Sequence, residues 1–264
     1  MAYWYSKFGT TTIAQVSPVH DISLPSRSQG VETIGGAVDP YGSEQALIAI
    51  PYTITVRGEE IANTLATLAT KFRALRPLVG QRDKLYRSMD GTSGTEWAYA
   101  RLVGMQAQRD GETQLATPYT MRFEIYSPVW NGTSVVTSAA LGTEPTTEIA
   151  VYNSGNADVR TPVITITAAT GAITNVTLTA NGETSLSWAG TLASGNDLVI
   201  DCGAGTVRND GTDAYSGVTF NAGHTVSYWV GLGAGATTTL TITRTASGDD
   251  VVGKVKVAYY EGWY

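Results

Sequence analysis

Apolar residues in the first part of the chain alternate with polar or small ones in several short runs. In the run from Ile48 to Val56 every second position is apolar, which is the period of a half-buried strand. Pro51 lies inside this run and has no N–H to donate, so we expect an edge strand or a bulge there. Similar runs predict further strands at Lys84–Arg87, Trp97–Val103 and Tyr119–Ile125.

At Gly58 the period changes to that of a helix. The next apolar residues are spaced four, three, four and three apart, and they are Ile61, Leu65, Leu68, Phe72 and Leu75. Glu59 and Glu60 fall in the predicted first turn and basic residues fall near the end, as the helix dipole favours. Pro77 ends the segment. We expect this single helix to pack its apolar face on a sheet.

Beyond Trp130 the helical period is absent. Residues 131–147 are rich in Thr, Ser, Ala and Gly, which predicts a connector with at most one short strand. From Glu148 onward, short apolar runs are separated by Gly, Asn and Asp turns. The predicted strands are Ile149–Tyr152, Val163–Thr167, Asn175–Thr179, Leu186–Trp188, Leu198–Cys202, Val226–Val230, Thr238–Thr243 and Lys254–Tyr260. Such a series indicates a β-sandwich of the jelly-roll type.

The two parts differ in charge. Up to Trp130 there are 12 basic and 12 acidic residues, and beyond it there are 5 and 11, which together give the totals of 17 and 23. No basic stripe is present that would hold phosphates, so specific nucleic-acid binding is not expected. The first part instead suits a wall past which DNA slides without sticking.

Groups able to carry catalysis or bind metal are few and scattered. The two histidines, His20 and His224, lie in loop-like segments far apart, and no zinc-binding spacing is present. Cys202 is the only cysteine and ends a predicted buried strand, which indicates an inert core thiol. We therefore expect no enzyme activity, no metal and no cofactor.

Two turn-like segments carry alternative interpretations. The Gly-rich run 231–235 precedes a strand and not a helix, so it predicts a hairpin turn and not a phosphate loop. Residues 209–213 offer oxygens to calcium, but their spacing differs from an EF-hand loop and a plain turn is favoured. Asp249 and Asp250 lie in another predicted turn.

Aromatic residues of the second part are candidates for sugar binding. Trp188 and Tyr215 are the carbohydrate-binding candidates, and Trp229, beside Tyr228 in a predicted strand, is either a third or a core residue. The segment Met1–Tyr5 lacks the features of a signal peptide, and no apolar run is long enough to span a bilayer. Synthesis and assembly in a cytoplasm are expected.

The order of these features resembles the distal tail proteins of long, non-contractile-tailed bacteriophages. In the first part the resemblance rests on the strand–Gly58–helix–Pro77 order and on Ala100–Leu102 and Phe123–Trp130. In the second part it rests on five further segments: Asn153–Gly155 with Pro162, Leu198–Asp201, Thr206–Val207 before Asp210-Gly211, the Trp229–Gly235 turn, and Val255–Tyr259.

The resemblance implies a ring, typically hexameric, at the tip of the phage tail in the virion. The domain at 1–130 would be a tail-tube-like β-sandwich or barrel with one helix, and DNA would pass through its lumen. The domain at 148–264 would be an outward, galectin-like jelly-roll sandwich, joined by the connector 131–147. The partners implied are the tail-tube protein above and the tail hub or fibre below. An arm to the neighbouring subunit would contain Gln81, Lys84, Tyr86 and Trp97.

A mostly β, non-catalytic structural protein is thus the leading interpretation. One alternative is a carbohydrate-binding or host-adhesion protein that recognises a glycan of the host surface. Another is a major tail-tube subunit with an extra sandwich domain. A glycan hydrolase would need paired carboxylates in a cleft, and the sequence places none.

Overall fold

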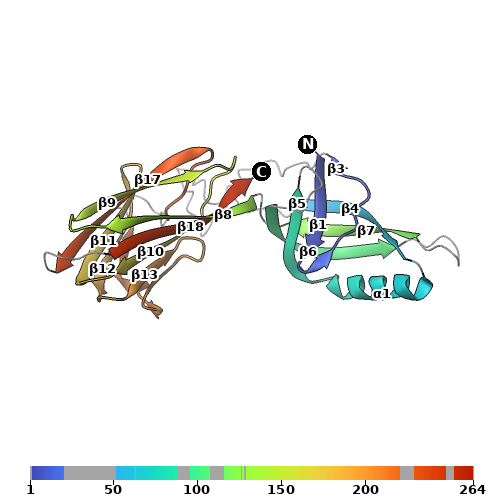
Figure 1. The fold of residues 1–264 in the computed structure, drawn as a ribbon, viewed down its shortest axis with the longest axis horizontal. Coiled ribbons are helices and arrows are strands. Elements are labelled where there is room, and N and C mark those ends of the chain that lie inside the picture. Colours follow the sequence, from blue (N-terminus) through green and yellow to red (C-terminus); the bar gives the residue numbers. More distant parts are fainter. Residues whose placement is uncertain are drawn as a thin grey trace, which may run out of the picture. The chain divides into compact units, whose positions relative to one another are not determined.

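The computed structural model describes residues 2–20, 52–62, 64–88, 96–107, 116–125, 127, 129–220, 229–247 and 253–263. The chain divides into two compact units, Met1–Asn131 and Gly132–Tyr264. Both consist mainly of antiparallel strands (Figure 1), so the predicted mostly β fold class is confirmed.

The first unit is built on one antiparallel sheet whose strands lie in the order β4-β7-β6-β5-β1-β2, with β3 also paired to β1. Its strands are β1 (Ala2–Phe8), β2 (Thr11–Thr12), β3 (Val19–His20), β4 (Tyr52–Ile61), β5 (Arg82–Ser88), β6 (Glu96–Ala107) and β7 (Ala116–Ile125). The three predicted strands after the helix are confirmed as parts of β5, β6 and β7. The first four predicted residues of the earlier run, 48–51 with Pro51, lie outside the described residues.

Alternation of apolar and polar residues gives this sheet two different faces. In β7, for example, Met121, Phe123 and Ile125 are buried while Arg122 between them is exposed. The rings of Phe8 and Phe123 lie 5.2 Å apart, so β1 and β7 meet in the same core although only β6 and β5 connect them in the sheet. The opposite face of β5 and β6 is turned to solvent.

The one α-helix of the described residues begins later than predicted. Helix α1 spans Leu65–Leu75 and is capped by Thr64, whose side chain accepts a hydrogen bond from the Thr67 N–H at 3.2 Å. Glu59 and Glu60 therefore lie in β4 and not in the first helical turn, which contains no acidic residue. Ile61 also belongs to β4 and is 63% exposed, so it does not join the buried helical stripe.

Gly58 marks a close contact inside β4 and not the start of the helix. A Cβ at this position would collide with the ring of Tyr119 and lie 2.7 Å from the carbonyl oxygen of Ala14. The alternating burial of β4 continues past Gly58 to Glu60, which accounts for the longer strand. The predicted end of the helix is confirmed, because Pro77 lies in the 3-10 turn η1 (Arg76–Leu78) that follows it.

Most of the segment predicted to be a connector is strand. Strand β8 (Trp130–Leu141) covers 12 residues, and β9 (Thr146–Asn153) begins five residues later. In the described second unit β8 pairs with β18, so its Thr- and Ala-rich sequence is held by sheet hydrogen bonds in spite of the weak apolar period. Its middle part alternates exposed and half-buried positions, and both sides carry a mixture of small polar and apolar residues, so the sequence pattern gave no strand signal.

The second unit contains two antiparallel sheets. Their orders are β15-β14-β13-β10-β18-β8 and β16-β12-β11-β17-β9. The further elements are β10 (Val163–Ala168), β11 (Ala172–Ala180), β12 (Glu183–Leu192), β13 (Asp197–Asp201), β14 (Thr206–Asn209), β15 (Thr212–Asp213), η2 (Tyr215–Gly217), β16 (Val218–Phe220), β17 (Ala236–Ser247) and β18 (Gly253–Trp263). Apolar residues from both sheets form one core, including Ile164, Leu178 and Val257.

Six of the eight predicted strands of this unit lie wholly within observed strands, and a seventh, Leu198–Cys202, coincides with β13 except that Cys202 follows the strand in a turn. The eighth, Val226–Val230, lies mainly outside the described residues, and Trp229 and Val230 are not in a strand. The predicted turn at Asp210-Gly211 is confirmed; it closes the β14–β15 hairpin, with φ of 48° and 77° that suit a tight primed turn. Cys202 is buried as predicted, and burial raises the pKa of its thiol to about 12.

Candidate binding and assembly surfaces

An outward-facing group of aromatic and basic side chains covers one end of the first sheet. Strand β5 places Lys84 and Tyr86 on this side and buries Leu85 and Arg87 on the other, as the period of two requires. The group, called here the cation–aromatic face, consists of Lys7, Arg82, Lys84, Tyr86, Trp97 and Tyr99.

Strand register brings these side chains together. Tyr86 pairs directly with Trp97, and Lys84 pairs with Tyr99 across the β5–β6 ladder. The ammonium of Lys84 lies 3.8 Å from the centre of the Trp97 ring, and the Arg82 guanidinium lies 5.6 Å from the Tyr99 ring. Because Tyr99 is 47% exposed, the face offers aromatic surface and positive charge to solvent together.

The intersubunit arm at 81–97 stays a prediction. In the described part of this segment, β5 is hydrogen-bonded to β1 on one edge and to β6 on the other. Gln81 precedes β5, and its carbonyl oxygen accepts from the N–H of Leu102 at 3.1 Å. Lys84, Tyr86 and Trp97 share one surface, whereas Gln81 lies in the turn that leads into it. Residues 89–95 lie outside the described part.

A buried ion pair supports the cation–aromatic face from the inner side of the sheet. Arg87 is 1% exposed and its Nε donates to Glu96 Oε2 at 2.7 Å. The guanidinium also lies 4.2 Å from the ring centres of both Tyr3 and Trp130. This cluster joins β1, β5, β6 and β8 in the first unit, so it fixes the strands that carry the outer residues.

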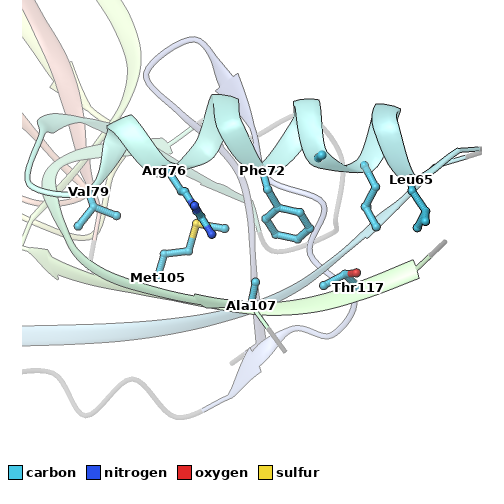
Figure 2. Close-up of a pocket in the computed structure, with 9 residues that line it drawn as sticks. Leu65, Phe72, Arg76, Val79, Met105, Ala107 and Thr117 are labelled. Carbon is cyan, nitrogen blue, oxygen red and sulfur yellow. The ribbon is translucent and has the colours of Figure 1, made fainter. Parts of the chain in front are cut away.

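A second surface of the first unit is the groove between α1 and the ends of β6 and β7 (Figure 2). It has a volume of about 330 Å³ and is lined mainly by apolar side chains, among them Leu65, Phe72 and Met105, with Arg76 near one end. The Phe72 ring points from the helix toward the sheet and meets Tyr119 edge-on at 6.1 Å. Only Leu68 and Leu75 of the helix are fully buried, so the predicted helical stripe is partly open.

In the second unit, Tyr215 belongs to a group of three aromatic rings. Its centroid lies 6.5 Å from Phe220 and 6.4 Å from Trp229, and the last two lie 5.2 Å apart. Tyr215 is 43% exposed, whereas Phe220 and Trp229 are partly buried and pack against the core. Tyr215 therefore presents the outer ring of the group.

A hollow of about 510 Å³ lies beside Tyr215. It is lined by Gly205, Thr206, Arg208, Gly211, Asp213 and Tyr215, which come from the β14–β15 hairpin and its flanks. Arg208 and Asp213 are directly opposite each other in the ladder of this hairpin. The hollow thus combines one aromatic ring with a donor group, an acceptor group and glycine backbone.

Trp188 does not contribute a surface to this hollow, which corrects its prediction as a sugar platform. It is 3% exposed and packs in the core of the sandwich. Its indole N–H donates to the carbonyl oxygen of Ala214 at 3.2 Å, immediately before Tyr215. The large apolar ring explains the burial, and its single polar atom holds the turn that carries Tyr215.

The remaining candidates form no reactive site in the described part of the chain. His20 lies in β3, while His224, Asp249 and Asp250 lie outside the described residues. Within the described ranges no group of three or more His, Cys, Asp or Glu side chains is placed to hold a metal ion. None of the described helices is long and apolar enough to cross a membrane.

Sequence reasoning missed several members of these surfaces. Lys7 and Tyr99 join the cation–aromatic face through strand register, and the strand containing Lys7 was not predicted. Arg208 and Phe220 lie in short strands, β14 and β16, whose apolar pattern is too brief to stand out. The Asp210-Gly211 turn was the one available signal, since a hairpin there implies paired strands on both sides.

The second unit is similar to a known family of protein domains. Residues 154–263 match the family described as "Siphovirus-type tail component, C-terminal domain". The match covers most of the second unit and none of the first. No curated protein sequence matches the chain.

Solved structures extend the likeness to the fold of most of the chain. The crystal structure of the SPP1 Dit protein, titled a paradigm of the hub adsorption apparatus in phages that infect Gram-positive hosts, is 14% identical with a TM-score of 0.56. The alignment covers 80% of this chain and 79% of that chain. A phage P2 baseplate structure is 8% identical with a TM-score of 0.41, covering 97% and 90% of the two chains.

Together, the family match and the SPP1 Dit fold confirm the predicted resemblance to the distal tail proteins of siphophages. The family match supports a structural role in a phage tail, and a tail component is part of the virion.

Proposed function

Because residues 154–263 match a siphovirus-type tail component domain, we propose that this protein forms a hexameric ring at the tail tip. The ring connects the tail tube to the hub or fibre and lets DNA pass through its lumen. The first unit forms the ring, and the second is a galectin-like module that projects outward. The protein has no enzyme activity, and it is assembled in the host cytoplasm.

The observation that carries the ring proposal is the cation–aromatic face. Its aromatic rings and Arg82 are of the kinds enriched at protein interfaces, where Trp, Tyr and Arg supply most of the binding energy. The face lies on β5 and β6, strands that the inner Arg87 cluster holds in place. A rigid, partly apolar patch of this kind suits contact with a neighbouring copy.

The positive charge of the cation–aromatic face indicates whether it faces the lumen or a neighbouring subunit. Exposed Lys and Arg would attract DNA phosphates and slow the passage of DNA through a lumen. We therefore assign the cation–aromatic face to the contact between subunits and not to the lumen wall. Acidic groups of a neighbouring copy, or of the hub protein, would complement it.

The test is the mass of the purified full-length protein at micromolar concentration, alone and with the tail-tube or hub protein. A hexamer would have about six times the 27.9 kDa mass of one chain. Lys84→Glu is expected to weaken assembly because it reverses a charge beside Trp97, whereas Lys254→Glu, on β18 of the second unit, is the matched control. A strict monomer that also fails to bind either tail protein would overturn the proposal.

A major tail-tube subunit with an extra sandwich domain is the second candidate, favoured by the single sheet and helix of the first unit. Such a protein would form long polymers or repeat along the tail in electron micrographs. One copy of the ring per tail, seen by antibody labelling at the tip, would exclude it.

A further inference from the structure

The hollow beside Tyr215 has the components of a sugar-binding site. The Tyr215 ring is its exposed apolar surface, and Phe220 and Trp229 support that ring from the side of the core. A pyranose ring has an apolar face of C–H groups and a rim of hydroxyls, so it suits one aromatic surface next to polar side chains.

The polar groups of the hollow favour a ligand without net charge. Arg208 would repel a cation and Asp213 would repel an anion, and both border the same space. A neutral polyol satisfies both, because its hydroxyls accept from the guanidinium and donate to the carboxylate. The 5 basic and 11 acidic residues beyond Trp130 further disfavour a polyanionic glycan or nucleic acid.

The backbone around the hollow is shaped for close approach. Gly205 and Gly211 line the hollow and have φ of 65° and 77°, a region that favours glycine, so neither position places a side chain in the hollow. A Cβ at Gly211 would meet nothing within 4 Å, which leaves space there for a ligand. The volume of about 510 Å³ lies in the range of small-molecule sites.

The Tyr215 turn is positioned before any ligand arrives. Asp213 Oδ1 accepts from the Tyr215 N–H at 3.1 Å, and the Ala214 N–H donates to the Val207 carbonyl oxygen at 2.9 Å. The buried indole of Trp188 donates to the carbonyl of Ala214 on the other side of the same turn. A preordered turn lowers the entropy that binding must overcome.

We propose that this hollow binds a neutral glycan, with Tyr215 as the stacking platform and Arg208 and Asp213 as hydrogen-bonding groups. The site lies wholly within the second unit, so it goes beyond the ring-forming role and does not depend on it. Trp188 acts as a positioning residue for the Tyr215 turn.

The test applies an array of neutral glycans built from hexoses and N-acetylhexosamines, together with sulfated, phosphorylated and sialylated ones, to the full chain. Hits are then titrated in solution and followed by tryptophan fluorescence. Tyr215→Ala is expected to weaken binding of a neutral glycan by about tenfold or more, and Tyr215→Phe to retain most of it. Arg208→Ala is expected to weaken binding as well.

Tyr152→Ala is the matched control, because Tyr152 is 56% exposed on β9 of the same unit and does not line the hollow. Its binding should equal that of the unchanged protein. The proposal is overturned if no neutral glycan binds at millimolar concentration, if charged glycans bind in preference, or if Tyr215→Ala, shown to be folded by circular dichroism, binds as before.

Discussion

Arg87 shows how a single buried charge organises the first unit. The side chain is 1% exposed, pairs with Glu96 at 2.7 Å and lies between the rings of Tyr3 and Trp130. The indole N–H of Trp130 in turn donates to the hydroxyl of Tyr52 at 2.9 Å, so strands distant in sequence meet at one polar cluster. Removing one member leaves the others buried without their partner.

Arg87→Ala is therefore expected to destabilise the protein by about 3–5 kcal/mol, because Glu96 would remain as an unpaired charge in the core. The free energy of unfolding in urea measures this. Lys71→Ala is the comparison. Glu60, its partner at 2.9 Å, is as buried as Glu96, but the Lys71 side chain is 42% exposed, so water can take its place beside the carboxylate. Its loss should therefore cost clearly less than that of Arg87, and equal costs for the two variants would contradict the argument.

Burial of two weak acids predicts a loss of stability at alkaline pH. Burial raises the pKa of the Cys202 thiol to about 12 and that of the Tyr119 hydroxyl to about 12. Both groups favour the folded state only while protonated, so their contribution is complete below their unfolded pKa values of about 9 and 10. It is lost as the pH rises from there toward 12.

The free energy of unfolding, measured from pH 8 to pH 11, should fall at the upper end of this range. A Cys202→Ala variant should fall less steeply, because the thiol no longer contributes to the titration. The thiol itself should react with a maleimide only when the protein is unfolded. A flat pH profile, or rapid labelling of the native protein at pH 8, would show that Cys202 is not buried as described.

At the scale of elements, β4 and α1 show where sequence periodicity succeeds and where it fails. The helix was found because Leu65, Leu68, Phe72 and Leu75 repeat over its full length, and its end was marked by Pro77. Its start was placed too early, because Ile61 fits the helical spacing although it belongs to β4. The structure resolves the conflict at Thr64, whose side chain caps the helix.

Other elements gave weak signals for physical reasons. Both faces of strand β8 carry small polar and apolar residues, such as Val135 and Thr137 on one face and Val136 and Ser138 on the other, which hides a period of two. Strands β14 to β16 are at most four residues long, too short for any pattern. The cation–aromatic face was harder to predict than the strands. Lys84 and Trp97 meet only through the register of β5 with β6, which no local sequence pattern specifies.

Gly58→Ala tests the close contact that lengthens β4. The added Cβ would collide with the Tyr119 ring and crowd the Ala14 carbonyl, so we expect a loss of about 1–3 kcal/mol in the free energy of unfolding. Gly104→Ala on β6 is the matched control, because nothing lies within 4 Å of its added Cβ. That change should be neutral or stabilise by up to about 1 kcal/mol; a harmless Gly58→Ala would mean that Tyr119 yields without strain.

For the whole molecule, the two units have separate cores with different energetic roles. Leu85 of the first unit and Leu178 of the second are both fully buried, each among residues of its own unit. Domains with their own cores generally unfold as separate cooperative units. This separation would let the second unit bind a ligand without loosening the first.

Calorimetry of the full chain tests this division with a matched pair of variants. Leu85→Ala and Leu178→Ala should each cost about 2–5 kcal/mol and lower the Tm of one transition by more than about 5 °C. Each should leave the other transition in place, because the deleted side chain contacts only its own core. A single transition that both variants shift equally would contradict separate unfolding of the two units. In that case the units would unfold as one, and a ligand at the Tyr215 hollow would stabilise the first unit as well.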